Sequence, residues 1–217
     1  MNILVIRNSE TAPEGAFGDW LIRQGHRLTV MAGADVTDDA MQSAALVVML
    51  GSPHAVYQTE IPWIATQRRM VAARLAAHKP TIGICFGAQM MAAAAGGEVR
   101  RHPEGTFFRG WRGIDDTADP VLAGPWPRWH GDVITAPPGA EVIASDAGTV
   151  QAFRLPNAIG VQFHPEATPD LMQGWARLSP PGSVDAAALA EDSARLFEAR
   201  SAARDALFAA LLRQAGV

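Results

Sequence analysis

The first half of the chain alternates short apolar runs with longer amphipathic segments, and this alternation constrains the fold more than any other feature. Aliphatic and β-branched runs predict strands, and apolar residues spaced three and four apart predict helices. The expected strands are Asn2–Ile6, His26–Met31, Ala45–Leu50 and Pro80–Ile84, and the expected helices are Gly15–Gln24, Ile61–His78 and Phe86–Ala95. Strands that are apolar throughout are buried on both faces. We therefore expect an α/β three-layer sandwich with a mostly parallel central sheet flanked by helices.

The second half of the chain has first a strand-like and then a helical sequence pattern. Short strand-like pieces separated by Pro and Gly predict hairpins that extend the sheet, and these are Thr106–Ile114, Glu141–Ser145, Val150–Leu155 and Ala158–Phe163. From Thr168 the pattern is helical again, and Ser183–Gly216 is predicted to be one C-terminal helix, with Ser183 as its N-cap and Gly216 just beyond its end. We expect a single domain, with a core over about residues 1–175 and a C-terminal helical segment over about 183–216.

Charge and composition narrow the classes of partner. With 18 Lys and Arg against 22 Asp and Glu, the net charge is −4, so the chain lacks the basic excess that nucleic-acid binding needs. No apolar stretch is long enough for a membrane span, and no leader pattern precedes the first strand. A single cysteine suits a reducing compartment. We expect a cytoplasmic protein that binds neither nucleic acid nor membrane; its oligomeric state is left open.

A glycine-flanked cysteine marks the junction of a predicted strand and helix, in Gly83-Ile84-Cys85-Phe86-Gly87. Such a G-x-C-x-G pattern is typical of a nucleophile elbow, whose tight turn leaves little room for side chains beside the nucleophile. The helix that begins at Phe86 would direct backbone N–H groups and its positive dipole end at the thiol, favouring the thiolate. We interpret Cys85 as a nucleophile in a strained, exposed position. The alternative is a small core residue, since free cysteine is often buried.

A second motif, Gly160-Val161-Gln162-Phe163-His164-Pro165-Glu166, ends the last predicted strand. Strand periodicity places His164 and Glu166 on the same side of the backbone, and Pro165 fixes the turn of the chain between them. A histidine oriented by a carboxylate is the general base that a thiol nucleophile needs. Both motifs fall at the C-terminal edge of the predicted sheet, where α/β folds bind ligands. Their joint occurrence favours a catalytic role over an ordinary surface histidine.

Together the two motifs resemble those of the class I glutamine amidotransferases, whose patterns are G-x-C-x-G-x-Q and F-H-P-E. The resemblance runs from Asn2 to about Trp175, and it includes the loop Gly51-Ser52-Pro53 and a Trp-x-x-His-Gly-Asp-like stretch at Trp126–Asp132. The arrangement is most similar to the glutaminase half of guanosine monophosphate synthetase and its stand-alone relatives. No segment resembles the S-G-G-x-D loop of the synthetase half.

The resemblance implies a triad in which Cys85 is the nucleophile, His164 the base and then the acid, and Glu166 the residue that orients the imidazole. The residues that would hold the oxyanion or the substrate are Gly51, Ser52, Phe86, Gln89, His130 and Asp132. Two stretches depart from the family pattern. The loop usually reads G-G-P, and a glutamate–aromatic–glycine signature is matched only loosely by His102-Pro103-Glu104-Gly105.

The implied reaction is acyl transfer through a thioester, in which glutamine yields glutamate and ammonia, and a synthetase partner would receive the ammonia. If the leaving group is instead the amine of a γ-glutamyl conjugate, the chain would be a free-standing γ-glutamyl hydrolase or peptidase. A non-catalytic regulatory or scaffold protein with the same fold, and a redox sensor built on Cys85, are alternatives of another class. No metal or organic cofactor is expected, since no Cys/His cluster has ligand spacing.

Overall fold

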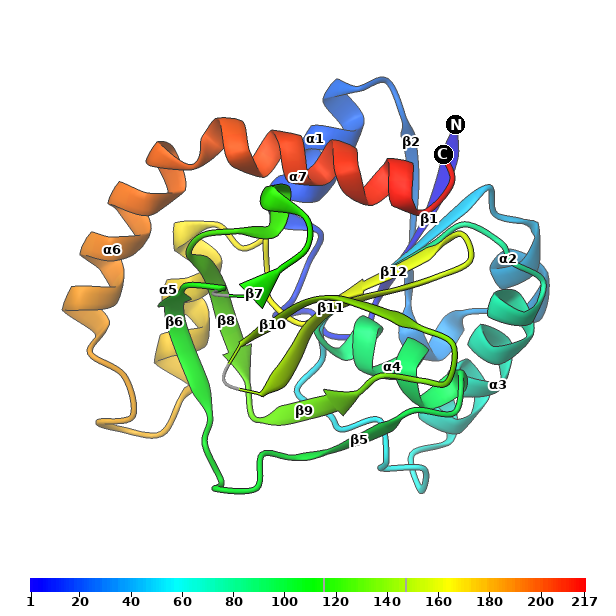
Figure 1. Ribbon diagram of the computed structural model, residues 1–217, viewed down its shortest axis with the longest axis horizontal. Helices are drawn as coiled ribbons and strands as arrows, with labels where there is room; N and C mark the ends of the chain where they lie inside the picture. Colours follow the sequence, from blue (N-terminus) through cyan, green and yellow to red (C-terminus); the bar gives the residue numbers. More distant parts are fainter. Residues whose placement is uncertain (115, 147) are drawn as a thin grey trace.

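The central sheet joins strands from both halves of the chain. The computed structural model describes every residue except Asp115 and Ala147. Across these described residues, the main sheet has eight strands in the order β2-β1-β3-β4-β12-β11-β10-β7 (Figure 1). They are β1 (Asn2–Arg7), β2 (Arg27–Ala32), β3 (Leu46–Met49), β4 (Thr81–Ile84), β7 (Asp116–Thr117), β10 (Glu141–Asp146), β11 (Thr149–Leu155) and β12 (Ala158–Val161).

The strands that come first in this order, from β2 to β12, run parallel, and β11, β10 and β7 continue the sheet in antiparallel fashion. The late strand β12 pairs with β4 in a register that places Gly160 opposite Gly83. The four residues of each of β3, β4 and β12 are all buried, as expected for strands covered on both faces. The carboxyl ends of β4 and β12 therefore lie side by side.

Helices cover both faces of this sheet. They are α1 (Gly15–Arg23), α2 (Asp38–Ser43), α3 (Pro62–Ala76), α4 (Phe86–Ala94), α5 (Pro169–Leu178), α6 (Ala186–Ala199) and α7 (Ser201–Gln214), with short 3₁₀ turns η1 (Gly33–Asp35) and η2 (Pro120–Leu122). In β1, Ile3 and Val5 belong to a core shared with α1 and α7, whereas Leu4 and Ile6 belong to one shared with α2, α3 and α4 (Figure 1). The predicted three-layer sandwich is confirmed.

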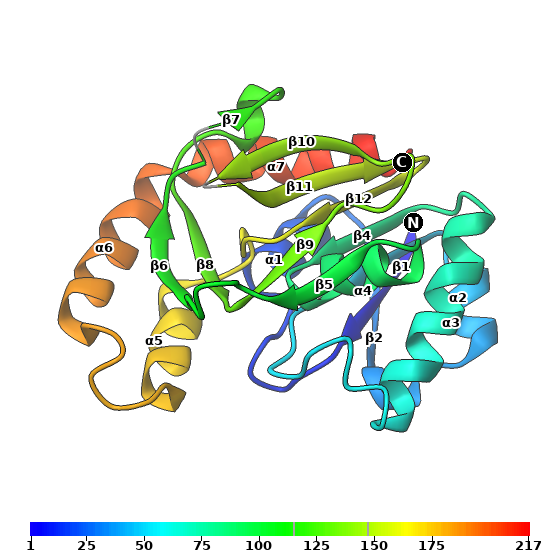
Figure 2. The same cartoon turned by 60° about the horizontal axis from the view of Figure 1, so that its bottom comes forward.

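The middle of the chain departs from the expectation that its strands extend the main sheet. Two separate antiparallel pairs form there: β5 (Glu98–Arg101) with β9 (Asp132–Thr135), and β6 (Phe108–Arg112) with β8 (Trp126–His130). The prediction that Thr106–Ile114 joins the sheet is therefore wrong, although those for β10, β11 and β12 are confirmed. The β6–β8 pair stands beside α5 and α6 (Figure 2), where Trp111 and Trp129 pack against an apolar cluster on those helices.

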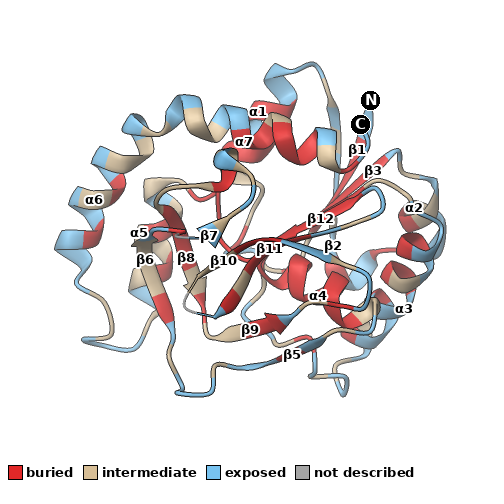
Figure 3. Ribbon diagram, viewed as in Figure 1, coloured by how far each residue is buried: buried red, intermediate tan, exposed pale blue. Residues whose placement is uncertain are grey.

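The prediction of one C-terminal helix from Ser183 to Gly216 is also wrong. Two helices form and meet at Arg200, which donates a hydrogen bond to the Ala123 carbonyl and stacks over Trp126 at 4.2 Å. Asp185 caps α6 in place of Ser183, whose hydroxyl bonds the Pro180 carbonyl instead. Figure 3 shows α6 largely exposed and α7 buried along one side, against the sheet. Within the described residues, no helix combines the length and apolar character that crossing a membrane requires.

Candidate active site

Cys85 occupies a sharp turn between β4 and α4 that depends on its flanking glycines. A Cβ added at Gly83 would lie 2.6 Å from the Ala88 nitrogen, and one at Gly87 would lie 2.2 Å from the Met49 carbonyl oxygen. Cys85 itself has φ 50° and ψ −107°, a conformation that residues with a side chain rarely adopt. This geometry is the nucleophile elbow that the sequence predicts at this strand-to-helix junction.

The position of Cys85 is less exposed than we expected. The residue is only 5% exposed, and it lines a cavity of about 550 Å³ instead of standing on the outer surface. Its side chain makes no capping hydrogen bond at the start of α4. The N–H groups of that first helical turn have no partners within the helix, so they leave a positive end beside the cysteine.

His164 and Glu166 are buried beyond the end of β12 and bonded to each other. The Nδ1 atom of His164 lies 2.7 Å from Oε1 of Glu166. Backbone hydrogen bonds hold both residues in place: His164 N–H donates to the Pro127 carbonyl at 2.8 Å, and Ala16 N–H donates to the Glu166 carbonyl at 2.9 Å. Elements distant in the chain, β8 and α1, thus fix the orientation of this pair.

Electrostatics favour a protonated His164. Burial by itself would lower the pKa of His164, but the Glu166 carboxylate and the neighbouring Cys85 together raise it well above its ordinary value. The Nε2 atom of His164 is buried and has no nitrogen or oxygen partner among the described residues, and the Cys85 side chain lies close enough to raise the pKa of the imidazole by a hydrogen bond and by its charge. With Nδ1 occupied by Glu166, Nε2 is the ring nitrogen left for chemistry.

The cavity brings together most of the residues that the sequence singles out. Its lining includes these predicted residues: Gly51, Ser52, Cys85, Gln89, His130, Asp132 and His164. Phe86 and Glu166 lie behind the wall, Phe86 with its ring against Trp63 and Glu166 against His164. One part of the lining comes from segments that follow β1, β3, β4 and β12, so the cavity lies at the carboxyl edge of the parallel strands; the rest comes from the region of β5, β6, β8 and β9 and from the end of α5.

The loop after β3 lies directly against the histidine. A Cβ at Gly51 would come within 3.2 Å of Cε1 of His164. Ser52, which replaces the second glycine of the family loop, does not have a positive φ, so a side chain is tolerated there. Its hydroxyl accepts a hydrogen bond from the His54 N–H at 3.1 Å, which stabilises the turn.

His130 and Asp132 line another part of the cavity. His130 is buried, and its Nδ1 atom lies 2.9 Å from the Asp132 carbonyl, so Nδ1 carries the proton and donates it. Burial lowers the pKa of His130 to about 3. Burial also raises the pKa of the Asp132 carboxyl, whose Oδ1 accepts a hydrogen bond from the Tyr57 hydroxyl at 3.3 Å. Among the described residues, no group of three His, Cys, Asp or Glu side chains is placed to hold a metal ion.

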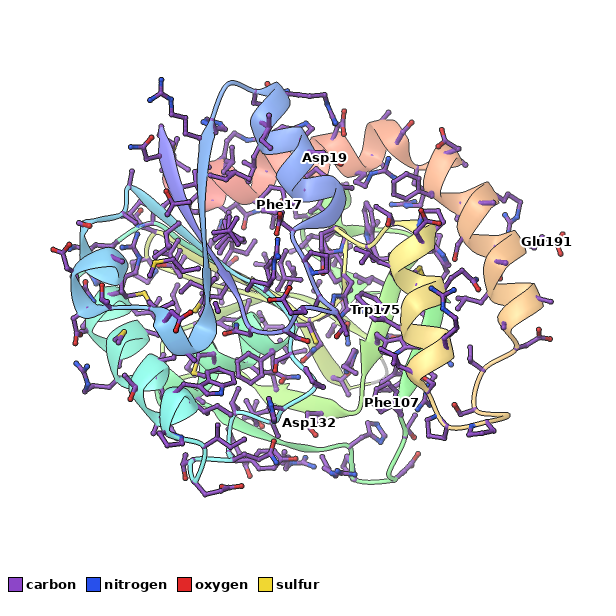
Figure 4. All side chains as sticks on the ribbon, turned by 180° about the vertical axis from the view of Figure 1, so that it is seen from behind. Phe17, Asp19, Phe107, Asp132, Trp175 and Glu191 are labelled. Carbon is purple, nitrogen blue, oxygen red and sulfur yellow. The ribbon has the colours of Figure 1, made fainter. Side chains whose placement is uncertain are left out.

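Sequence reasoning missed several residues of the site. Gln162 accepts a buried hydrogen bond from Gln89 at 3.2 Å, and its alternation with His164 along the strand could have indicated this. Trp175 packs on the His164 ring at 4.8 Å, but its helical spacing resembles that of a core residue. Figure 4 shows Trp175 on the inner side of α5, with Phe107 and Asp132 on the same side of the molecule. Arg109 also lines the cavity, and it had no distinguishing local signal.

Comparison with solved structures agrees with this architecture. A glutamine amidotransferase from Thermotoga maritima superposes with a TM-score of 0.85 at 21% identity, covering 98% of each chain. A glutamine amidotransferase from Methylobacillus flagellatus superposes with a TM-score of 0.83 at 24% identity, covering 99% of this chain and 93% of the other. At these identities the likeness establishes the fold.

Proteins related in sequence indicate the family. The GMP synthase (glutamine-hydrolyzing) of Paraburkholderia phymatum is 32% identical over 178 residues, which are 72% of this chain and 32% of that protein. That of Parafrankia sp. is 39% identical over 132 residues, which are 56% of this chain and 23% of that protein. The chain thus spans at most about a third of these relatives. The family model for glutamine amidotransferase class-I matches residues 19–174. The chain belongs to the class-I glutamine amidotransferase family.

Proposed function

We propose that the chain cleaves a γ-glutamyl amide, of which glutamine is the simplest, through a thioester on Cys85. The observation that carries this proposal is the strained cysteine at a helix N-terminus, in one cavity with a histidine that is bonded at 2.7 Å to a buried carboxylate. A cysteine, a histidine and an orienting carboxylate are the parts that nucleophilic acyl transfer requires.

In the proposed reaction, the Cys85 thiolate attacks the γ-carbonyl carbon, and a tetrahedral intermediate forms. Backbone N–H groups of Phe86, Gly51 and Ser52 are the proposed donors to its oxyanion. The His164 imidazolium gives its Nε2 proton to the leaving nitrogen as the carbon–nitrogen bond breaks. His164 then takes a proton from water, which attacks the thioester and releases glutamate and the free thiolate. Glu166 stabilises the imidazolium throughout.

Substrate binding is assigned to the polar wall of the cavity. Asp132, held by the Tyr57 hydroxyl, is the proposed acceptor for the α-ammonium group of the γ-glutamyl moiety. Gln89, tied to Gln162, and the neutral His130 are the proposed hydrogen-bonding groups for the rest of that moiety. Two observations support these assignments. Asp132, Gln89 and His130 line the same cavity, and each is held by a hydrogen bond to a neighbouring residue.

The relatives suggest where released ammonia would go. Because they are GMP synthases and this chain spans only part of them, we propose a synthetase partner in the cytoplasm as one acceptor of ammonia. The alternatives are a free-standing hydrolase of γ-glutamyl conjugates and a scaffold that keeps the fold without turnover.

Covalent labelling of Cys85 tests the proposal that this residue is the catalytic nucleophile, and it does not require turnover. A chloroketone analogue of glutamine should alkylate Cys85 much faster than it alkylates free cysteine, and excess glutamine or γ-glutamyl amide should slow the reaction. The measurement is intact-protein mass against time. His164→Ala should slow labelling strongly because the thiolate loses its counter-ion, and Glu166→Ala should slow it less because Glu166 acts through the imidazole.

Cys85→Ser serves as the control, since the chain has one cysteine and this variant should take up no label. Labelling no faster than that of free cysteine, with no protection by either ligand, would contradict the proposal and favour the scaffold. Labelling with protection, but without release of ammonia or amine from any substrate, would indicate a competent site that needs a partner subunit for turnover.

A further inference from the structure

The cavity has the size of a pocket for a small-molecule ligand. Its volume of about 550 Å³ falls within the range of roughly 300–1,000 Å³ that is typical of pockets for drug-sized ligands. Three large apolar side chains at its border are exposed to solvent: Tyr57, Phe107 and Leu178. Apolar groups gathered at the border of a pocket usually mark contact with a ligand or a partner.

An aromatic wall leads away from the catalytic histidine. The His164 imidazole packs on Trp175 with ring centres 4.8 Å apart, and Trp175 packs on Trp129 at 5.6 Å. All three residues line the cavity. Since His164 is the group that protonates the leaving nitrogen, the leaving amine lies at the start of this wall. Whatever the amine carries would extend along Trp175 and Trp129.

Arg109 lies next to the far end of the wall. In the β6–β8 pair, Arg109 stands opposite Trp129, so the two side chains share a face of that sheet. The guanidinium carbon is 4.0 Å from the centre of the Phe107 ring, which fixes its position. Within the described residues Arg109 forms no ion pair, and its Nε atom is buried without a hydrogen-bond partner.

The charged residues that line the cavity indicate which kind of group Arg109 would bind. Besides Cys85 and His164, which pair with each other in the proposed mechanism, the described lining of the cavity holds two arginines, Arg101 and Arg109, and one carboxylate, Asp132. Arg101 lies close enough to Asp132 to act on its ionisation, so these two charges compensate each other. The γ-glutamyl moiety carries one α-ammonium and one α-carboxylate, which that pair can satisfy. Arg109 lines the cavity without an ion-pair partner among the described residues, so its guanidinium is available to a second anionic group of the ligand.

We propose that Arg109, together with the wall of Trp129 and Trp175, forms a leaving-group subsite for an amine that carries a carboxylate. The substrate class is then γ-glutamyl amino acids and peptides, with an apolar or aromatic side chain on the leaving residue. This inference rests on the proposed function and narrows its substrate. Arg109 acts as a specificity-determining residue, and the bond that breaks is the γ-amide.

The reaction is balanced with water alone. The Cys85 sulfur forms a bond to the γ-carbon, the carbon–nitrogen bond breaks, and the His164 proton goes to the amine of the departing amino acid. Water then supplies the oxygen of the new γ-carboxylate and returns a proton to His164 as the carbon–sulfur bond breaks. The products are glutamate and a free amino acid or peptide.

Three ligands separate this subsite from the rest of the cavity: γ-glutamylphenylalanine, its C-terminal amide, and glutamine. For each we would measure kcat/KM and the concentration that half-protects Cys85 from the chloroketone analogue. The acid should exceed its amide by about 10- to 100-fold in both measurements, as expected for one charge-assisted contact. Arg109→Gln should reduce this ratio of acid to amide to near one. Arg112→Gln, an exposed arginine on the same strand that does not line the cavity, should leave it unchanged.

Two results would overturn the subsite. One is a wild-type protein that does not distinguish the acid from the amide. The other is an Arg109→Gln variant that weakens all three ligands equally, which would place Arg109 at the γ-glutamyl moiety or in the fold. Failure of the proposed function looks different, because glutamine and the conjugates would then neither react nor protect Cys85. Protection by glutamine with equal protection by acid and amide would remove the subsite alone.

Discussion

At the scale of single residues, His130 shows how burial sets the charge of a group in the cavity wall. Desolvation lowers its pKa to about 3, and the positive charges of His164 and Arg128 act in the same direction. The hydrogen bond to the Asp132 carbonyl raises the pKa of His130, but by less than burial and these charges lower it. His130 is therefore neutral near neutral pH, whereas the electrostatics of His164 favour its protonated form. The two histidines of one cavity differ in charge because only His164 has a carboxylate partner.

The neutral His130 predicts an acid-sensitive fold. The unfolded chain binds a proton at this residue below about pH 6.5, whereas the folded chain does not until about pH 3. The contribution of the neutral His130 to the free energy of unfolding is thus fully present above pH 6.5 and is lost as the pH falls toward 3. Between pH 7 and pH 5 the loss should be about 2 kcal/mol. His130→Asn keeps a donor for the Asp132 carbonyl and cannot titrate, so its free energy of unfolding should fall about 2 kcal/mol less over this interval.

Chemical denaturation of both proteins at the two pH values measures the difference. The raised pKa of His164 contributes with the opposite sign, but it is common to both proteins and cancels in the comparison. Equal pH dependence of the two proteins would contradict the assignment of a neutral, buried His130.

The candidate triad residues, which the sequence singles out and the structure places together, share a local signature. Cys85 stands in a pattern whose glycines are required by the turn itself, and His164 and Glu166 are two residues apart on one extended segment. Trp175 and Arg109 have no such signature, because their place in the cavity depends on packing between α5, β6 and β8. A tryptophan at helical spacing is usually a core residue, and an arginine in a short strand is usually solvated.

At the scale of elements, the elbow depends on close approach between α4 and β3. A methyl group at Gly87 would meet the Met49 carbonyl oxygen at 2.2 Å, and backbone cannot rotate away as a side chain can. Gly87→Ala should cost about 1–3 kcal/mol of stability and should slow the labelling of Cys85, since either α4 or β3 must move. Thermal unfolding and the labelling rate measure the two effects.

Gly174→Ala is the matched control. Gly174 is also helical, but a Cβ there would have only an Arg177 side-chain nitrogen near it, at 3.9 Å. We expect no loss of stability and a gain of up to about 1 kcal/mol, because alanine favours the helix. If Gly87→Ala were as harmless as this control, the elbow would not require its glycine.

Helices and strands could be predicted where they depend on a local sequence pattern. They could not be predicted where they depend on contacts between distant segments. The apolar runs of β1, β3, β4 and β12 identified the buried parallel strands. The β6–β8 pair could not be predicted, because its partners are separated by a turn-rich segment and its residues alternate weakly. The break at Arg200 lacks proline and glycine, and it results from the contacts of that arginine with Ala123 and Trp126.

At the scale of the whole molecule, α7 covers one face of the sheet although it lies well after His164 and Glu166 in the sequence. Leu207, Phe208 and Leu211 are fully buried, and the Phe208 ring lies 4.7 Å from Phe17 of α1. The same core includes Val161, at the end of the strand that leads to His164. The C-terminal helix thus supports the site from behind while none of its residues lines the cavity.

Phe208→Ala should lower the free energy of unfolding by about 3–5 kcal/mol, because it removes a fully buried ring from this core. That loss is a large fraction of the roughly 5–15 kcal/mol that stabilises a typical domain. The folded molecules that remain should still label Cys85 at the wild-type rate, since the change touches no group of the cavity. Phe197→Ala on α6, where the ring is only partly buried, should cost clearly less. If Phe208→Ala left stability intact but abolished labelling, α7 would act on the chemistry and the structural role assigned to it here would be wrong.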